Sequence, residues 1–246
     1  MSARFYCPKL SIPGPYHLDA EEARHLSQVC RVRVGDIVEL FDGEGRFLSA
    51  SVHEIGRNSV ELEGIGEPKI EPEPLVDLTL AVAVPKGDRF DWLVEKATEI
   101  GTTRLVPTQT KRSVVEPRST KLDRLRRTII EASKQCGRSR LMALDELTPW
   151  LRIAQSEVDA TRLIAHPGGV SFREWPEIAQ GSKVVLAVGP EGGFTDEEVA
   201  EATGRGWVPV TLGRSILRIE TACVVGGATI FARAAGLASN RDQAVH

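Results

Sequence analysis

The sequence lacks the motifs that mark several common classes of protein. Its 246 residues include four cysteines, and none forms a C-x-x-C pair or has a histidine at the spacing of a metal site. We therefore predict no metal site and reduced thiols. The chain also contains no G-x-x-x-x-G-K-[ST] loop and no strand-borne G-x-G-x-x-G, so neither a nucleoside triphosphate nor a dinucleotide has its usual binding loop.

Long apolar segments are absent too. The longest apolar stretch, residues 222–232, is much shorter than the roughly 20 residues that cross a membrane. The first residues carry no basic segment followed by an apolar one, as a secretory signal would. With 41% hydrophobic and 26% charged residues, the composition is typical of a soluble globular protein, and we expect it in the cytoplasm with no membrane partner.

An excess of basic residues is confined to one segment. The net charge of the chain is -3, yet residues 86–140 contain 14 Lys and Arg against 7 Asp and Glu. A basic cluster of this kind is typical of a protein that binds a phosphate backbone. The alternative interpretation is a solvent-exposed helix face.

The first part of the chain predicts a small β-barrel. One helix is expected at residues 19–30, with Asp19 as its N-cap. Around it, short alternating segments separated by glycine-containing turns are typical of strands. These expected strands are residues 37–41, 47–52 and 59–63.

A linker and an α/β domain follow. Three prolines within residues 67–74 predict the linker, because proline interrupts helices and sheet ladders. Beyond it, apolar strands alternate with helices, which favours a mostly parallel sheet. The expected strands are 78–84, 104–108, 162–165, 183–188 and 208–212; the expected helices are 88–101 with Asp88 as its cap, 120–136, 195–203 and 220–237. Small residues in the last helix predict close packing against another backbone.

Two loops at strand ends are the most informative feature. The first, VGPEGGF at residues 188–194, precedes a capping box of Thr195 and Glu198. The second, LGRSILRIETA, covers residues 212–222. Open α/β folds bind ligands at the carboxyl ends of strands, and glycine lets a ligand approach the backbone. Two such loops suit a flat heterocycle better than a polyphosphate, whereas the glycines alone are also compatible with a tight turn.

These loops resemble the signature of the SPOUT (knotted) RNA methyltransferases. More narrowly, they resemble the bacterial RsmE family, which methylates N3 of a uridine in 16S (small-subunit) ribosomal RNA. Matching residues occur along nearly the whole chain, including Arg24-His-Leu26, Lys86-Gly-Asp-Arg89, Lys96-Ala-Thr-Glu99 and Gln135-x-x-Arg138. The resemblance implies a PUA-like β-barrel RNA-binding domain at residues 1–70, a trefoil-knot methyltransferase domain with a parallel sheet at residues 74–240, and a homodimer.

The resemblance also implies a cofactor, S-adenosyl-L-methionine, and residues that act on the substrate. Arg218 is the first catalytic candidate, because positive charge favours an anionic uracil ring. Glu220 is the second candidate, either as acceptor of the N3 proton or as a residue that holds an arginine in place. The same two roles are possible for Glu191. The implied cofactor contacts are His166, Gly189, Glu191, Gly192, Gly193, Leu212, Gly213, Ile216, Leu217 and Arg218.

Five arginines are candidate contacts to the RNA partner, either 16S ribosomal RNA or the small ribosomal subunit. Arg112 and Arg138 match family arginines, and Arg4, Arg24 and Arg33 belong to the expected barrel. Two other functions remain open. One is a SPOUT enzyme that methylates a ribose 2'-hydroxyl or a transfer-RNA base, and the other is a non-catalytic RNA-binding ribosome assembly factor. The intact loops argue against the factor, because a pure binder has no use for a cofactor site.

Overall fold

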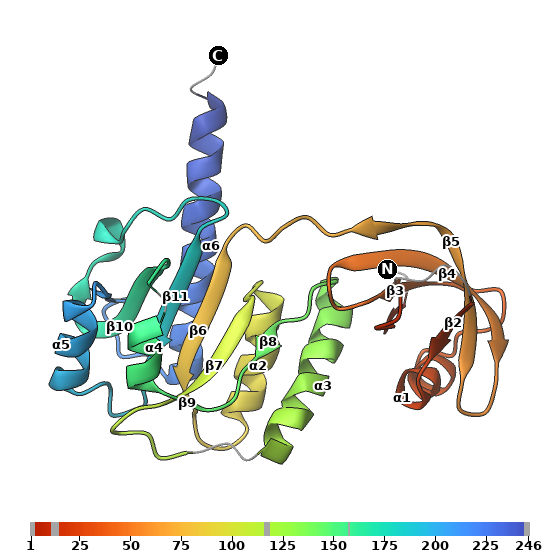
Figure 1. The fold of residues 1–246 in the computed structure, drawn as a ribbon, viewed down its shortest axis with the longest axis horizontal. Helices are drawn as coiled ribbons and strands as arrows, with labels where there is room; N and C mark the ends of the chain where they lie inside the picture. The colour runs from red at the N-terminus through yellow and green to blue at the C-terminus, as the bar shows by residue number, and fades with distance from the viewer. Residues whose placement is uncertain (1–2, 11–14, 116–118, 157, 244–246) are drawn as a thin grey trace. The chain divides into compact units, whose positions relative to one another are not determined.

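The structure, a computed structural model, describes residues 3–10, 15–115, 119–156 and 158–243 (Figure 1). Two compact units share the chain. The first comprises Met1–Pro72 together with Ile130–Leu141, and the second comprises Glu73–Ile129 with Met142–His246. The segment Ile130–Leu141 packs with the first unit, although it lies within residues 74–240, which were expected to form the second domain.

The first unit is built on a five-stranded sheet in the order β1-β3-β4-β5-β2. Its strands are β1 (Arg4–Tyr6), β2 (Pro15–Leu18), β3 (Ile37–Phe41), β4 (Arg46–Ile55) and β5 (Val60–Ile70). The β1–β3 pair is parallel and the other neighbours are antiparallel. Phe5, Leu40 and Leu62 lie in the buried core of this unit. The three predicted strands are confirmed, whereas β1 and β2 are additional edge strands.

Strand β5 extends into the predicted linker. Arg46 and Phe47 of β4 pair with Ile70 and Lys69, so Pro68 lies inside a strand. On the other side of β5, β2 pairs only with residues 60–63, so the later part of β5 is an edge. Proline is tolerated there because an edge position requires no further ladder bond from its missing N–H.

The predicted helix of the first unit is present in two parts. Helix α1 (Ala20–Arg24) continues as the π-helix η1 (His25–Val29). The carboxylate of Asp19 accepts hydrogen bonds from the backbone N–H groups of Glu21 and Glu22, which confirms the predicted cap. Arg31, just beyond η1, has a positive φ of 53°.

The second unit contains a seven-stranded sheet in which every recorded strand pair is parallel. The order is β12-β10-β11-β6-β7-β8, and β9 also pairs with β7. The strands are β6 (Asp77–Ala83), β7 (Arg104–Gln109), β8 (Ala143–Leu144), β9 (Thr148–Pro149), β10 (Thr161–Val170), β11 (Lys183–Val188) and β12 (Val208–Val210). The predicted parallel α/β sheet is therefore confirmed.

Helices cover both faces of this sheet (Figure 1). On one face, Trp150 of α4, Ala202 of α5 and Trp207 pack with Ala81 and Val185 of the strands. On the other face lies α6, which contacts α2 as well as β6 and β11. The helices after β6 are α2 (Arg89–Glu99), α3 (Ser119–Cys136), α4 (Trp150–Ser156), the 3-10 turn η2 (Phe172–Glu174), α5 (Asp196–Gly204) and α6 (Ile219–Gln243).

The small residues of α6 allow the close approach that the sequence predicts. A Cβ added to Gly226 would lie 2.4 Å from Leu186 Cδ2, and one added to Gly227 would lie 2.7 Å from Ile100 Cδ1. These positions therefore pack inside the unit, against the sheet and the end of α2. The trefoil knot stays a prediction. Within the described residues, no helix has both the length and the apolar character that crossing a bilayer requires.

Candidate functional site

Five parallel strands end at the same edge of the sheet of the second unit. Because β12, β10, β11, β6 and β7 are neighbours in that order, the loops after them gather at the carboxyl edge. The predicted ligand loops follow β11 and β12, and these two strands are not adjacent in the sheet. Strand β10 lies between them, so the last segment of β10, which includes His166, also lies between the two loops.

The loop after β11, residues 189–194, is a tight turn with a firm base. The N–H of Gly193 donates to the carbonyl of Pro190 over 2.8 Å, and Gly193 has a φ of +70°. Phe194 is 5% exposed and packs on Trp150 with ring centroids 4.8 Å apart. A Cβ on Gly189 would lie 2.9 Å from the Phe194 ring, whereas one on Gly193 would meet no atom within 4 Å. Gly189 is thus needed for packing, and Gly193 faces open space.

The capping box after this loop is confirmed. The Glu198 side chain accepts from the N–H of Thr195 over 2.8 Å, and the Thr195 hydroxyl accepts from the N–H of Glu198. By contrast, Asp88 occupies the predicted N-cap position but does not cap the helix with its side chain. Its backbone is helical, with φ -81° and ψ -1°, and its side chain makes no cap hydrogen bond. An N-cap requires an extended backbone for its side chain to reach the following N–H groups.

The loop after β12, residues 212–218, combines an open glycine with apolar side chains. Gly213 has a φ of +143°, and a Cβ added to it would meet no atom within 4 Å. Ile216 is 89% exposed, and Leu217 is half-buried. Leu212 turns inward, because its Cδ2 would lie 3.4 Å from a Cβ on Gly226. The loop therefore offers bare backbone and an apolar wall that the protein itself leaves uncovered.

His166 lies within a strand instead of after one. Strand β10 continues to Val170, but its register with β12 shifts between Ala165 and Val170. Inside this irregular stretch, His166 Nδ1 accepts a hydrogen bond from the N–H of Gly168 over 3.1 Å. Gly169 is required there, since its Cβ would lie 2.4 Å from the nitrogen of Val210. The bulge keeps half-buried His166 between the two loops.

The predicted catalytic pair is split between solvent and interior. Arg218 is exposed and makes no hydrogen bond or ion pair with any described side chain, while its carbonyl accepts from the N–H of Ala222. Glu220, in the first turn of α6, is 7% exposed, and its Oε2 has no partner among the described residues. Burial and the nearby Glu220 raise the pKa of the Cys223 thiol far above its usual range. Cys223 is therefore a neutral packing residue.

Glu191 and Arg112 both brace the loop after β11. Glu191 Oε1 lies 3.6 Å from Arg89 Nη2, and both side chains are partly exposed. Arg112 Nη1 donates to the carbonyl of Gly192 over 2.6 Å. Lys111 donates its backbone N–H to Glu198 Oε1 over 2.8 Å. Arg89 and Lys111 were not predicted as site residues, although both follow strands that end at this edge.

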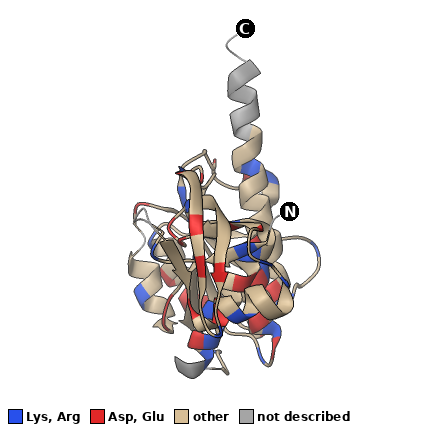
Figure 2. Cartoon of the chain, turned by 90° about the vertical axis from the view of Figure 1, so that its right-hand side faces the viewer, with Lys and Arg blue, Asp and Glu red and all other residues tan. Residues whose placement is uncertain are grey.

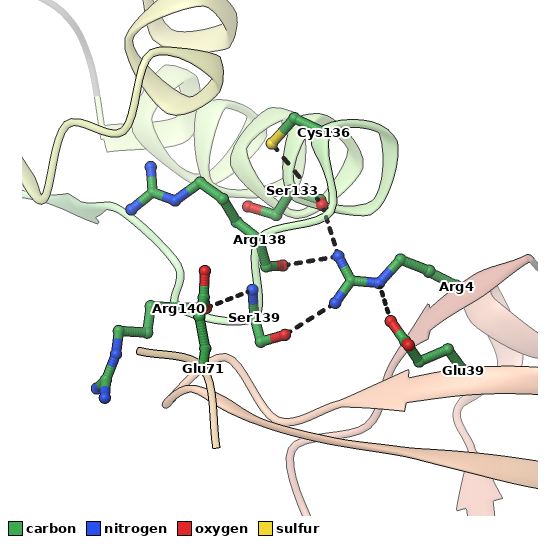
Figure 3. Close-up of polar contacts among 8 residues, drawn as sticks. All are labelled: Arg4, Glu39, Glu71, Ser133, Cys136, Arg138, Ser139 and Arg140. Atoms are coloured by element: carbon green, nitrogen blue, oxygen red, sulfur yellow. Dashed lines mark hydrogen bonds and ion pairs between the residues drawn. The ribbon is translucent and has the colours of Figure 1, made fainter. Parts of the chain in front are cut away.

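The first unit holds the other arginine candidates in two different environments. Arg24 and Arg33 are exposed. The side chain of Arg4 is 10% exposed and pairs with Glu39 over 2.6 Å (Figure 3). It also donates to the carbonyls of Ser133 and Arg138 and to the hydroxyl of Ser139. Arg4 thus fastens Ile130–Leu141 to the first unit, and these contacts favour a structural role over the predicted RNA contact.

Arg138 lies in the same cluster. Its side chain is partly buried, and this burial lowers the pKa of its guanidinium from the usual value. The neighbouring backbone is held by Glu71, whose Oε2 accepts from the N–H groups of Ser139 and Arg140 over 2.7 and 2.8 Å. Hydrogen bonds from Arg4 and to Glu71 therefore fix the backbone at and next to Arg138, while its side chain remains partly exposed.

Acidic side chains form ion pairs with several of the basic residues in the segment 86–140. Arg126 pairs with Asp123 and with Glu146, and Arg124 pairs with Asp91. Arg104 lies 2.6 Å from Asp145. Figure 2 accordingly shows blue and red residues interspersed along the chain. The excess found in residues 86–140 is thus not a uniform positive face, and individual exposed arginines are the sharper candidates for RNA contacts.

Comparisons with known proteins find two family domains along the chain. The model of an RNA methyltransferase domain matches residues 71–230, and the model of an RNA methyltransferase PUA domain matches residues 18–63. The ribosomal RNA small subunit methyltransferase E of Synechocystis is 33% identical over 92% of this chain and 75% of its own. The protein of the same name from Mycobacterium tuberculosis is 32% identical over 90% and 88%.

Solved structures give the same result. The ribosomal RNA small subunit methyltransferase E of Neisseria gonorrhoeae, bound to S-adenosyl methionine, has a TM-score of 0.86 and 30% identity, covering 94% of this chain and 97% of its own. A protein from Legionella pneumophila, also with bound cofactor, has a TM-score of 0.87 and 28% identity, covering 94% and 98%. The chain therefore belongs to the RNA methyltransferase family, as a member of the group named ribosomal RNA small subunit methyltransferase E.

Proposed function

We propose that this chain transfers a methyl group from S-adenosyl-L-methionine to N3 of a uridine in 16S ribosomal RNA. The observation that carries the proposal is the pair of open loops at the carboxyl edge, residues 189–194 and 212–218, on either side of the β10 bulge. The membership of the chain in the methyltransferase family supports the same activity.

The residues of the two loops fit the cofactor. Gly193 and Gly213 leave space that a Cβ would begin to fill, and both have backbone angles that favour glycine. Ile216 exposes nearly its whole side chain to that edge, where an apolar adenine ring would cover it. We propose that backbone from Gly189 to Gly193 and from Leu212 to Leu217 holds the adenosine. His166 closes the site from the bulge between them.

When bound, the cofactor supplies an activated methyl group on a sulfonium, so this chain need not activate the donor. Its remaining task is to align the uracil ring and to favour its anionic form. Arg218 is suited to the second task, because its guanidinium is exposed at the end of the cofactor loop and pairs with no described acidic group. We propose that Arg218 donates to a uracil oxygen and stabilises the negative charge that develops there.

Glu220 is suited to positioning. Its Oε2 atom has almost no exposed surface, which favours positioning over proton transfer, since a general base must reach the proton that it removes. A carboxylate in the first turn of a helix is also favoured by the helix dipole. We propose that Glu220 fixes the turn that carries Arg218 into α6. Glu191, through Arg89, orients the other loop.

The substrate base must be unpaired, because N3 of a uridine is hidden in a Watson–Crick pair. We propose that exposed Arg24 and Arg33 of the PUA-like unit contact phosphates of the same RNA, together with Arg138 of that unit and with Arg112 at the catalytic loops. Contacts of this type position the RNA and carry no sequence information.

We also propose a homodimer in the cytoplasm, on the grounds of the family resemblance. Light scattering coupled to size-exclusion chromatography tests the homodimer. A mass of two chains supports the dimer, and a mass of one chain at working concentration excludes it.

The direct test of the reaction is product analysis. Unmodified small ribosomal subunits and 16S RNA freed of protein are incubated with the protein and S-adenosyl-L-methionine, and the nucleosides are then separated and identified by mass spectrometry. 3-Methyluridine supports the proposal. A 2'-O-methylated nucleoside, or methylation of transfer RNA alone, indicates another SPOUT activity. Subunit binding with no methylated nucleoside indicates an assembly factor.

A further inference from the structure

Arg112 joins two loops that come from different strands. It belongs to the turn after β7, while its Nη1 donates to the carbonyls of Gly192 and Phe194 in the loop after β11, over 2.6 and 3.5 Å. Its side chain also lies along Gly192, because a Cβ added there would be 3.3 Å from Arg112 Cδ. One edge of the guanidinium is therefore committed to the backbone next to Gly193.

The backbone around Arg112 is held to the same loop. Thr110 and Ser113 close a turn, since the N–H of Thr110 donates to Ser113 Oγ over 2.9 Å and the N–H of Ser113 donates back to the carbonyl of Thr110. Glu198, 6% exposed, accepts from the N–H of Lys111 with one oxygen and from the N–H of Thr195 with the other. A movement of the loop after β11 thus moves Arg112.

The second edge of the Arg112 guanidinium is free to bind a ligand. The side chain is exposed, and neither Nε nor Nη2 makes a hydrogen bond within the described ranges of the chain. Arginine presents five N–H donors in a rigid fork, which lets it bind two acceptors at once and suits a phosphate in particular. Lys111, beside it, is 62% exposed and adds positive charge, offset in part by Glu197 at 3.6 Å.

We propose that Arg112 couples the cofactor loop to bound RNA, with one edge of its guanidinium on the Gly192 carbonyl and the other on an RNA phosphate. The inference rests on the proposed function and adds a coupling residue to it. Cofactor bound against residues 189–194 holds Arg112 in place for the RNA, and RNA that binds Arg112 holds the loop in place for the cofactor. Because coupling between two binding sites is reciprocal, each ligand raises the affinity for the other by the same factor.

The test measures this factor with S-adenosylhomocysteine, which cannot donate a methyl group. The affinity of the protein for unmodified small ribosomal subunits is measured by thermophoresis without and with saturating S-adenosylhomocysteine. We expect the wild type to bind subunits about 5-fold or more tightly with it. In Arg112→Ala, subunit binding weakens and the ratio falls to about 1. Arg112→Lys keeps the charge but offers a single point of donation, so its ratio falls while its cofactor-free affinity stays near the wild type.

Arg126→Ala is the matched control. Arg126 is an exposed arginine of the same basic segment whose partners are Asp123 and Glu146, neither of which belongs to the cofactor loop. Its removal should leave the ratio unchanged. An Arg112→Ala protein with the wild-type ratio overturns the coupling role, as does a wild type that binds both ligands independently. Failure of the wild type to bind S-adenosylhomocysteine is a different result, which overturns the proposed function itself. Arg112→Lys serves as the deciding variant if Arg112→Ala does not fold.

Discussion

Lys134 and Glu22 form an ion pair that is almost completely buried in the first unit. Their side chains are each 7% exposed, and Lys134 Nζ lies 2.7 Å from Glu22 Oε1. The other carboxylate oxygen of Glu22 accepts from the N–H of Tyr6, and the ammonium of Lys134 lies 6.0 Å from the centre of the Phe5 ring. The pair therefore ties the end of α3 to α1 and β1, in a segment that the sequence pattern assigned to the other domain.

Removing one partner of this pair should strongly destabilise the first unit. Lys134→Met leaves the carboxylate of Glu22 buried without its counter-ion, and we expect the free energy of unfolding to fall by about 3–5 kcal/mol. In the double variant Glu22→Met with Lys134→Met, no charge is left buried, and most of this loss should be recovered. Urea unfolding followed by circular dichroism measures both. Equal destabilisation in the single and double variants would contradict a role for the charges.

The same pair should make stability fall at alkaline pH. Burial acts to lower the pKa of Lys134, but hydrogen bonds to Glu131 and Glu22 outweigh it and hold this pKa above its ordinary 10.5. A lysine with a raised pKa in the folded state stabilises fully below the unfolded pKa, and this contribution is lost as the pH rises through the folded pKa.

We therefore expect wild-type unfolding free energy to drop above pH 10.5 more steeply than that of the double Met variant. Urea titrations between neutral and alkaline pH provide the measurement. Parallel curves for the two proteins would show that the pair does not titrate in this way.

Gly226 should tolerate no side chain. A Cβ there would lie 2.4 Å from Leu186 Cδ2, so Gly226→Ala forces the buried Leu186 side chain, α6 or β11 to shift. Overpacking of this kind costs about 1–3 kcal/mol. Gly236→Ala in the same helix is the control, because nothing lies within 4 Å of its added Cβ. That variant should be neutral or slightly more stable, since alanine favours helix. Thermal unfolding measures the stability of both variants. Equal changes in stability for Gly226→Ala and Gly236→Ala would refute the role of close packing at Gly226.

Arg218 should affect the reaction more than cofactor binding. For Arg218→Ala we expect kcat/KM for subunit methylation to fall by about 10²–10³, the usual effect of losing one group that stabilises developing charge. The cofactor affinity should stay within about threefold, because the adenosine is held by backbone. Arg214→Ala removes an exposed arginine of the same loop and should retain most activity. Single-turnover methylation assays with both variants decide the matter, and an active Arg218→Ala enzyme would exclude the assigned role.

The strongest local signals in the sequence lead to correct structure. Thr195 and Glu198 exchange hydrogen bonds within four residues of the chain, so the capping box needs no contact with a distant segment. Continuous apolar runs such as residues 184–188 predict buried parallel strands because both faces of the sheet are covered. The glycine loops are predictable for the same reason, since the turn and the strand before it are adjacent in the chain.

Other features depend on backbone geometry and tertiary contacts that the residue pattern does not carry. Asp88 is a residue type that often caps helices, but its backbone after Gly87, at φ +68°, is helical and its side chain makes no cap hydrogen bond. Ile130–Leu141 belongs to the first unit because Arg4, Glu22 and Glu71 bind it from more than 60 residues away. Arg4 and Arg24 look alike in sequence, yet only the fold decides that Arg4 is buried and Arg24 is exposed.

The measurement that tests the cofactor site most directly is isothermal titration with S-adenosyl-L-methionine of the wild type, Gly193→Val and Gly181→Val. Gly193 and Gly181 have φ values of +70° and +77°, and neither has an atom within 4 Å of its added Cβ, so valine strains both backbones alike. Only Gly193 lies in the proposed cofactor loop, whereas Gly181 precedes β11 at the opposite edge of the sheet.

We expect the wild type and Gly181→Val to bind the cofactor, while Gly193→Val binds about tenfold more weakly or not at all, because its side chain fills the open space beside the proposed adenosine. Wild-type protein that binds no cofactor, or Gly193→Val protein that binds as tightly as Gly181→Val, would contradict a cofactor site at these loops.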